Sequence, residues 1–292
     1  MKCYYHNDHD GRCAGAIVAH ATSNYNKEDF FEVDYTMELP LDTVEDGETV
    51  LFVDYSFKEN TFHVLEDLLK RGCEVIWIDH HTSSIRLCET NDIERNILGV
   101  RLEGISGAAL TWMYLYNCEF EDIPYFVKLI SDYDCWQYKY DPDTTHFKLG
   151  IETVDFDALD EVWKDLIICD TYYTTYRDHY GSYIDIGETI KTYIDKQNTY
   201  YREHFAYESE VGGYKCLVVN QKTNSWVFGE KYNEYPIVMV WVFDGEKYTY
   251  SIFSGDKNVD CCKIAESYGG GGHRSAAGFS SSEMLFRKVK GN

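Results

Sequence analysis

The sequence predicts an α/β fold with an N-terminal, mainly parallel sheet flanked by helices, a helical connector and a smaller C-terminal α+β domain. Over the first half of the chain, short apolar runs that resemble buried strands alternate with segments of helical periodicity. One long helical pattern follows, and apolar or alternating runs then return. We therefore expect domains at residues 1–182 and 206–292, joined by a connector at 183–205.

The individual elements follow from local pattern. In the N-terminal part we expect strands at residues 2–5, 49–56 and 73–81, and helices at residues 13–21, 62–71, 106–117 and 122–132. In the C-terminal part we expect the connector helix, strands at residues 214–220, 235–243 and 247–253, and a helix at residues 259–268. Gly72 closes the second helix, as glycine commonly does after a basic last turn.

The charge balance excludes one class of function. The 292 residues carry a formal net charge of −23, which argues against non-specific binding of long nucleic acid, because such binding depends on Lys and Arg. Only the tail after residue 255 has more basic than acidic residues, which favours anion binding there. No apolar run is long enough to span a bilayer, and no secretory leader is evident, so we expect a cytoplasmic protein with reduced thiols.

Ligand-type side chains follow three predicted strands. Asp54 and Asp79 lie at carboxyl ends of strands, and His6 follows the first strand in the same way. In a parallel sheet these ends share one rim, where ligands bind. A lone Asp54 would be more typical of a turn or helix cap. The convergence of three strands favours a site.

Two short motifs near this rim favour metal binding. In "HNDHDG", His6, Asp8 and Asp10 occupy alternate positions, so an extended loop would turn all three toward one site. A polar turn with exposed charges is the alternative. In "WIDHHTS", one of the adjacent His80 and His81 can bind metal while the other meets a substrate or a partner of a ligand, and Asp79 can orient a histidine. Imidazole with carboxylates suits Mn²⁺, Fe²⁺, Zn²⁺ or Mg²⁺.

Two further motifs lie downstream. "LISDYDCW" places Asp132 and Asp134 at a predicted helix end, where the helix dipole disfavours acids and a functional reason gains weight. "YGGGGHRSAAGF" places His273 and Arg274 after four glycines, whose amides can converge on an anion. A flexible linker is the alternative, but it seldom separates two apolar elements and ends in His-Arg.

In this order, "HNDHDG", "FVDYS", "DHH", "ISDYD" and "GGGGHRSAAGF" resemble the DHH phosphoesterase family, with its DHH-associated C-terminal domain. The resemblance covers nearly the whole chain and includes oligoribonucleases that act on very short RNA. It implies two Mn²⁺ ions, for which Mg²⁺ or Co²⁺ can substitute. The metal ligands that it implies are His6 and Asp8 for one ion, Asp10, His80 and Asp132 for the other, and Asp54 as the bridge.

The resemblance also implies roles in catalysis and substrate binding. His81 would face the scissile phosphate, and Asp79 would support the histidines. The substrate contacts that it implies are Ser106, Gly270, Gly271, Gly272, His273 and Arg274. One departure is visible, because Phe253-Ser254 stands where related short-substrate enzymes carry an Arg-Ser pair. That departure leaves the substrate pose open.

We therefore expect a metal-dependent phosphodiesterase that hydrolyses short RNA or DNA oligonucleotides, or dinucleotides, to mononucleotides. The alternatives are a 3′-phosphoadenosine 5′-phosphate phosphatase and a cyclic-dinucleotide phosphodiesterase, with a pyrophosphatase less favoured. A non-catalytic nucleotide sensor represents another class. We expect no binding of long duplexes and no membrane association, and a homodimer stays open.

Overall fold

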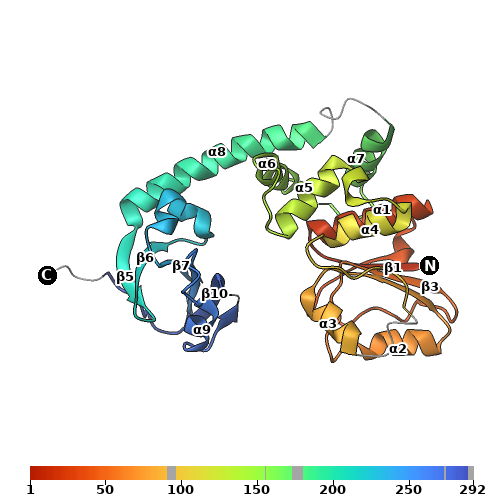
Figure 1. The fold of residues 1–292 in the computed structure, drawn as a ribbon, viewed down its shortest axis with the longest axis horizontal. Coiled ribbons are helices and arrows are strands. Elements are labelled where there is room, and N and C mark those ends of the chain that lie inside the picture. Colours follow the sequence, from red (N-terminus) through yellow and green to blue (C-terminus); the bar gives the residue numbers. More distant parts are fainter. Residues whose placement is uncertain (91–96, 155, 173–179, 273, 289–292) are drawn as a thin grey trace. The chain divides into compact units, whose positions relative to one another are not determined.

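The computed structural model describes residues 1–90, 97–154, 156–172, 180–272 and 274–288. These residues form two compact units, 1–190 and 191–292, drawn in Figure 1. The boundary falls inside α8 (Tyr180–Phe205), the helix that the sequence predicts as a connector. The predicted limits at 182 and 206 stay predictions.

Unit 1 is built on a four-stranded parallel sheet. Its strands are β1 (Lys2–His6), β2 (Phe30–Val33), β3 (Thr49–Val53) and β4 (Glu74–Ile78), in the order β2-β1-β3-β4. All three pairings are parallel, which confirms the predicted α/β class. β2 was not expected, because its sequence "FFEV" is short and carries a central acid.

The helices of unit 1 cover both faces of this sheet. They are α1 (His9–Thr22), α2 (His63–Lys70), α3 (Thr82–Thr90), α4 (Gly107–Tyr116), α5 (Tyr125–Asp134), α6 (Asp143–Ile151) and α7 (Glu161–Tyr172). Strand side chains alternate between two cores. Tyr5 and Val53 pack with α1, α4 and α5, whereas Tyr4 and Phe52 pack with α2.

Two glycines allow α6 and the start of α8 to approach closely. A Cβ at Gly187 would lie 1.6 Å from the carbonyl oxygen of His146, and a Cβ at Gly150 would lie 1.8 Å from that of Tyr183. Because each glycine faces backbone of the other helix, neither contact can be relieved by moving a side chain. The crossing therefore requires glycine at both positions.

Unit 2 is built on a six-stranded mixed sheet. Its strands are β5 (Tyr207–Val211), β6 (Tyr214–Asn220), β7 (Ile237–Phe243), β8 (Tyr248–Phe253), β9 (Gly271–Gly272) and β10 (Ala276–Ser281), in the order β5-β6-β7-β8-β10-β9. Within this sheet, only β6 and β7 pair in parallel among the described strands. The short helix α9 (Cys261–Glu266) packs against one face through Ile264 and Ala265. The predicted α+β class of this part is confirmed.

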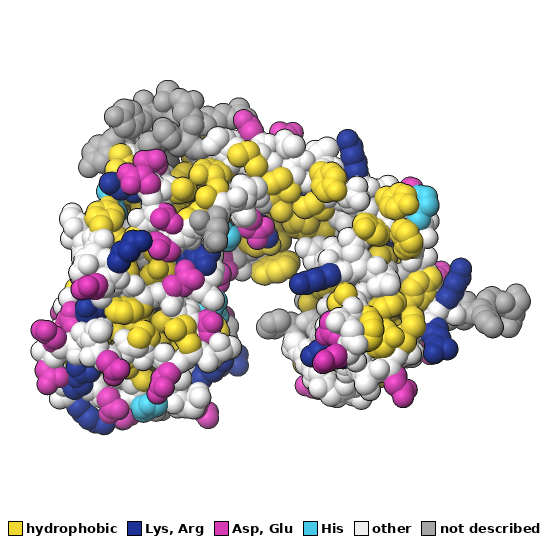
Figure 2. Space-filling view, turned by 180° about the vertical axis from the view of Figure 1, so that it is seen from behind, with side chains coloured by type: hydrophobic (Ala, Val, Ile, Leu, Met, Phe, Trp, Pro, Cys, Tyr) yellow, Lys and Arg dark blue, Asp and Glu magenta, His cyan; other side chains and the backbone are white. Residues whose placement is uncertain are grey.

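Acidic side chains are spread over the surface instead of gathering in one patch on the face shown in Figure 2. Basic side chains lie between them on the same face. This distribution agrees with an excess of solvated surface acid. Within the ranges that the structure describes, no helix combines the length and apolarity needed to cross a membrane.

Candidate metal centre

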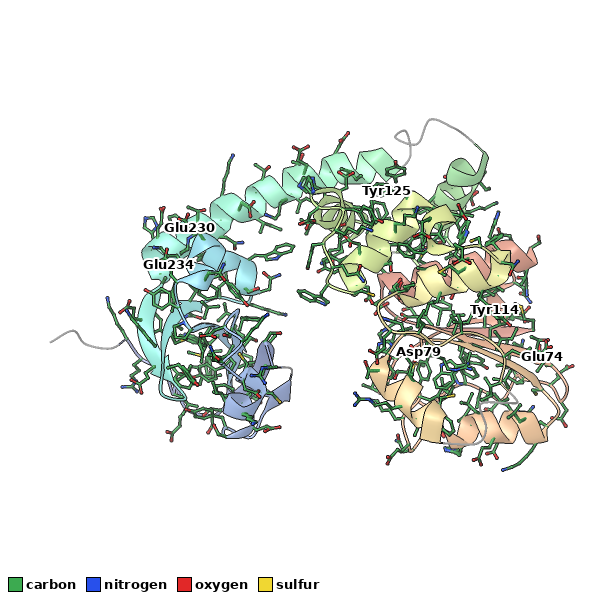
Figure 3. All side chains as sticks on the ribbon, in the orientation of Figure 1. Glu74, Asp79, Tyr114, Tyr125, Glu230 and Glu234 are labelled. Atoms are coloured by element: carbon green, nitrogen blue, oxygen red, sulfur yellow. The ribbon has the colours of Figure 1, made fainter. Side chains whose placement is uncertain are left out.

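The carboxyl edge of the parallel sheet gathers side chains from three strands. β1 ends at His6, the residue after β3 is Asp54, and Asp79, His80 and His81 follow β4. Asp79 lies at this edge of unit 1 in Figure 3. The rim predicted from the strand pattern therefore exists, and its potential ligands come within a few ångströms of one another.

Asp54 lies at the centre of this rim. Its backbone is left-handed, with φ of 53°, and its amide donates a 2.9 Å hydrogen bond to the carbonyl of Ile78. The residue is 1% exposed, and its Oδ1 has no hydrogen-bond partner among the described residues. Burial, together with repulsion from Asp10, raises the pKa of Asp54 well above its usual range.

Gly107 explains how α4 can begin next to Asp54. A Cβ at Gly107 would lie 2.4 Å from the Cβ of Asp54 and 2.7 Å from its Oδ1. Any larger residue would push the carboxylate out of the rim. The start of α4 is therefore part of what positions this ligand.

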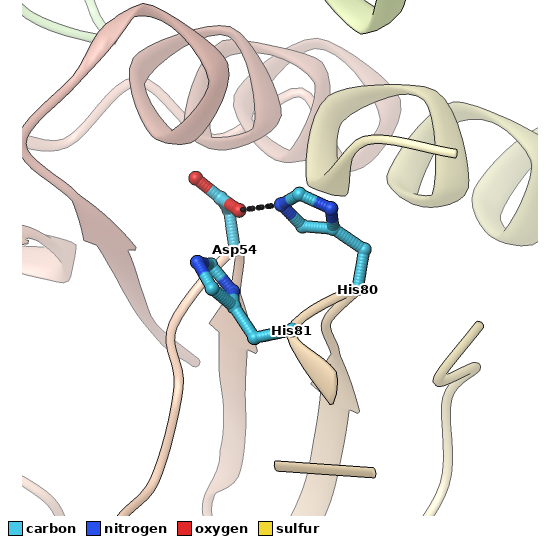
Figure 4. A group of neighbouring side chains, drawn as sticks. All are labelled: Asp54, His80 and His81. Atoms are coloured by element: carbon cyan, nitrogen blue, oxygen red, sulfur yellow. Dashed lines mark ion pairs between the residues drawn. The ribbon is translucent and has the colours of Figure 1, made fainter. Parts of the chain in front are cut away.

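His80 contacts three carboxylates. Its Nε2 lies 3.3 Å from Oδ1 of Asp54, 3.2 Å from Oδ2 of Asp134 and 3.9 Å from Oδ2 of Asp10. Figure 4 shows the imidazole directed at Asp54. Burial lowers the pKa of His80, but a hydrogen bond with Cys135 and the nearby carboxylates outweigh it and raise the pKa to about 9. A protonated His80 thus supplies part of the positive charge that the acids require.

His81 is held by Asp79. The fully buried Asp79 accepts a 2.7 Å hydrogen bond from Nδ1 of His81 through Oδ1, which also accepts from the amide of His80 at 2.8 Å. This bond fixes the orientation of the imidazole and leaves its Nε2 for other contacts. The geometry matches the expected support of a histidine by Asp79.

His6 and Asp8 form a pair, although by a different local structure from the one expected. Asp8 is the N-cap of α1, and its Oδ1 accepts from the amide of Gly11 at 2.9 Å while its Oδ2 contacts Nδ1 of His6 at 2.7 Å. The extended loop predicted for "HNDHDG" is wrong, because α1 begins at His9. Burial raises the pKa of Asp8, but these hydrogen bonds outweigh it and lower the pKa to about 2.

Asp10 is held by the start of α4. Its two oxygens accept from the amides of Gly107 at 2.7 Å and Ala108 at 3.1 Å, where the helix dipole favours a negative charge. Ser106 is fully buried, caps α4 and hydrogen bonds to Asp10. Ser106 thus helps to position a carboxylate, and its expected substrate contact stays a prediction.

The expected ligand Asp132 does not reach the cluster. Its carboxylate accepts from the amides of Lys139 at 2.9 Å and Tyr140 at 3.0 Å, and from the hydroxyl of Thr144. These three donors hold the loop after α5. Two residues later, Asp134 takes the place at His80. Burial, then the charge of Asp10, raises the pKa of Asp134 to about 7.

Cys135 is a potential ligand that the sequence did not single out. Its sulfur, a nitrogen of His80 and an oxygen of Asp134 lie within 4.8 Å of one another. Two more groups of this kind join Asp54 with His80 and His81, and Asp54 with His6 and Asp8. The adjacency of Cys135 to Asp134 was the only sequence signal for it.

The donor set fits divalent cations. Asp10 and Asp54 are at most 3% exposed, and buried carboxylates without full charge compensation are costly. Nitrogen and oxygen donors with one sulfur suit Mn²⁺, Fe²⁺, Co²⁺ or Zn²⁺, and the carboxylates also suit Mg²⁺. Asp54 belongs to two of these ligand groups.

The glycine-rich segment of unit 2 is only partly described. His273 lies outside the described residues. Gly271 and Gly272 form β9 and pair with β10, and a Cβ at Gly270 would lie 2.1 Å from the carbonyl oxygen of Gly278. Chain packing thus accounts for Gly270 and Gly272, whereas a Cβ at Gly271 would meet no atom within 4 Å. Arg274 is exposed and donates a 2.7 Å hydrogen bond to the carbonyl of Lys257.

Ser254, the second residue of the Phe253-Ser254 pair that replaces Arg-Ser, does not face solvent. It is 5% exposed, its hydroxyl donates to the carbonyl of Pro236 at 2.7 Å, and it accepts from the amide of Asp256 at 3.1 Å. These bonds fix the turn after β8. The side chain is therefore committed to the fold of unit 2.

No family model matches the chain. It is 27% identical to an uncharacterized protein of Acanthamoeba polyphaga mimivirus, over 84% of this chain and 55% of that protein. It is 24% identical to the oligoribonuclease NrnB of Bacillus subtilis, over 97% of this chain and 73% of that one. The chain thus spans little more than half the length of the viral relative.

Among solved structures, the chain is similar to the pGpG-specific phosphodiesterase PggH of Vibrio cholerae, with a TM-score of 0.54 and 12% identity. That match covers 97% of this chain and 94% of the other. It is also similar to the DHH domain of a protein described as a member of a family of ribosomal proteins, with a TM-score of 0.50 and 14% identity, over 94% and 81% of the two chains.

Fold and site together define an α/β protein with a carboxylate–histidine centre at the carboxyl edge of a parallel sheet. The chain has the fold of DHH-domain proteins, and the resemblance to the DHH phosphoesterase family that the motifs indicate is confirmed.

Proposed function

We propose that the protein is a two-metal phosphodiesterase that hydrolyses very short oligonucleotides, including dinucleotides, to mononucleotides. Asp54 carries this proposal. It is buried, its Oδ1 has no hydrogen-bond partner among the described residues, and it belongs to ligand groups on both sides of the rim. These are the properties of a carboxylate that bridges two cations.

The proposed ligands divide between two ions. His6 and Asp8 join Asp54 on one side, and Asp10, His80 and Asp134 join it on the other. We propose Mn²⁺ as the ion, with Mg²⁺ or Co²⁺ as substitutes. Two bound cations supply Lewis acidity to a phosphate ester and lower the pKa of a water molecule toward neutrality.

The protein's own groups orient the substrate. The hydrogen bond that Nδ1 of His81 donates to Asp79 fixes the imidazole, whose Nε2, when it carries a proton, can donate to a phosphate oxygen. Asp10 stays fixed by two amides, so the charge of the site is preorganised and does not reorient during the reaction. We further propose that residues 206–292 bind a substrate phosphate through Gly270, Gly271, Gly272, His273 and Arg274.

Short substrates are favoured by two observations. The strongly acidic chain opposes binding of long polyanions. NrnB is named an oligoribonuclease and PggH a pGpG-specific phosphodiesterase, which supports a dinucleotide or a short oligonucleotide here. The cytoplasmic location and the homodimer stay predictions.

The test offers 2-mers, 5-mers and 24-mers of RNA and of DNA to the full chain with Mn²⁺. We expect the 2-mers to be cleaved fastest and His80→Ala to abolish turnover. His63→Ala, an exposed histidine on α2, serves as the matched control and should retain activity. Equal or faster cleavage of the 24-mer would refute the preference for short substrates.

The same experiment separates the alternatives. 3′-Phosphoadenosine 5′-phosphate and cyclic dinucleotides enter as parallel substrates, and either one being cleaved faster than every linear oligonucleotide would replace the proposed substrate. Nucleotide binding without Mn²⁺-dependent hydrolysis of any of these esters would favour the nucleotide sensor.

A further inference from the structure

A pocket of about 280 Å³ opens directly beside the metal centre within unit 1. Asp8, Asp10 and Asp134 form one end of it, so it is continuous with the proposed metal ligands. The rest of its wall comes from α5, from α6 with the following Glu152, and from His9 at the start of α1. His9 and Tyr133 belong to the motifs "HNDHDG" and "LISDYDCW", but no role was predicted for either.

The chemistry of the wall changes away from the carboxylates. Leu129, Ile130, Phe147 and Ile151, each at most 7% exposed, form an apolar floor. Such a surface offers no hydrogen bond to a phosphate or a sugar hydroxyl. It favours a flat, weakly polar group, because that group can leave water without losing strong hydrogen bonds.

The rim of the pocket is aromatic and carries a charged pair. Tyr133 lines it, with the ring of the 71% exposed Trp136 stacked at 6.2 Å and the ammonium of Lys148 4.9 Å from the Tyr133 ring. Lys148 also contacts Glu152 at 2.7 Å. The rim thus offers a stacking face, a hydrogen-bond donor and an acceptor, which are the groups that bind a nucleobase.

The size of the pocket limits its occupant. Pockets for small ligands measure roughly 300–1,000 Å³, so a volume of about 280 Å³ suits one ring system and not a whole dinucleotide. With the phosphate at the carboxylate end, where cations would bind it, the attached base reaches the apolar end. Only one nucleotide of the substrate can be held in this way.

We propose that this pocket is a base-binding subsite for the nucleotide that carries the scissile phosphate. Tyr133 stacks on the base, the floor formed around Ile151 receives its edge, and Lys148 with Glu152 contacts its polar atoms. The proposal rests on the proposed function for its substrate. The base-binding subsite is tested by measuring ligand binding, so the result does not depend on catalysis.

The experiment compares AMP with ribose 5-phosphate, which has the same sugar phosphate but lacks the base. Their dissociation constants are measured by calorimetry on the full chain in the presence of Mn²⁺. We expect AMP to bind about ten-fold more tightly to the wild type, as the stacking of one base supplies. Equal affinity of the two ligands would overturn the base subsite.

Three variants locate the effect. Tyr133→Leu removes the stacking ring and Ile151→Phe fills the floor, so each should bring the ratio of the two dissociation constants close to one. Tyr114→Leu, an exposed tyrosine on α4, is the matched control and should keep the ratio of the wild type. If Ile151→Phe does not fold, Tyr133→Leu alone decides. If the folded pocket variants keep the wild-type ratio of the two dissociation constants, the base binds outside this pocket.

Failure of the subsite differs from failure of the proposed function. A protein that prefers AMP through Tyr133 but cleaves no dinucleotide would retain the subsite and lose the phosphodiesterase. A protein that cleaves dinucleotides with equal affinity for AMP and ribose 5-phosphate would retain the phosphodiesterase and lose the subsite.

Discussion

Exchanging Asp132 and Asp134 for asparagine, one at a time, separates the carboxylate that the resemblance implies as a ligand from the one that contacts His80 in the structure. In Asp132→Asn, the side chain becomes a neutral amide. The hydrogen bonds from the amide of Tyr140 and the hydroxyl of Thr144 are then lost or no longer go to a charged oxygen. Hydrogen bonds to charged groups contribute about 1.5–3 kcal/mol each. We therefore expect Asp132→Asn to lower the free energy of unfolding by about 3–6 kcal/mol, the sum for two such bonds.

Asp134→Asn should behave in the opposite way. Its side chain is 31% exposed and faces the like charge of Asp10, so its loss should change the free energy of unfolding of the metal-free protein by less than about 1 kcal/mol. Even residues that only support metal ligands change affinity by about 10–100-fold. A direct ligand should therefore cost at least about 100-fold in Mn²⁺ affinity.

Urea unfolding in a chelator measures the first quantity, and calorimetric titration with Mn²⁺ measures the second. Each variant is the control of the other, because each removes one carboxylate charge from the last turn of α5. A stable Asp132→Asn protein that has lost Mn²⁺ binding, beside an Asp134→Asn protein that binds as the wild type does, would refute the assignment of these two residues.

Four more predictions rest on the contacts of His80, Gly187 and Cys135. The pKa of His80 rises from 6.5 to about 9, so His80 stabilises the metal-free fold fully below pH 6.5 and loses this contribution as the pH rises through 9. Between pH 6.5 and 9, the thermal midpoint in a chelator should therefore fall by more in the wild type than in His80→Gln. An equal fall in the two proteins would contradict the raised pKa of His80. Mn²⁺ must displace that proton, so Mn²⁺ affinity should increase over the same range, as titrations at about pH 6.5 and about pH 8.5 would measure. Gly187→Ala should destabilise unit 1 by about 1–3 kcal/mol or more, because its Cβ meets the backbone of His146; urea unfolding that matches wild type would show that the helices separate easily. Cys135→Ser should weaken Zn²⁺ binding more than Mg²⁺ binding, since only the softer Zn²⁺ favours a sulfur ligand. Equal losses of affinity for the two ions in competition titrations would exclude a sulfur ligand.

The parallel sheet and its rim were predictable because their signals are local. Apolar strands that end in an acid or a histidine mark carboxyl ends, and parallel pairing brings these ends together. Asp54, Asp79 and His6 follow from that rule alone. The alternation of Tyr4 and Tyr5 between two cores follows from the strand period.

The choice between Asp132 and Asp134 was not predictable from local pattern. It depends on where α5 ends and on the loop that follows, in which Trp136 and Tyr138 adopt positive φ angles. Asp132 is satisfied by donors seven or more residues away, which no short motif reveals. The pocket beside the centre was missed for the same reason, since α5 and α6 meet only through tertiary packing.

Soaking crystals of the full chain with Mn²⁺ and recording anomalous scattering tests the central claim most directly. We expect two Mn²⁺ peaks at the carboxyl edge of the parallel sheet, bridged by Asp54, with Asp134 and not Asp132 among the ligands. A single peak, or two peaks that Asp54 does not join, would contradict a two-metal centre at this rim.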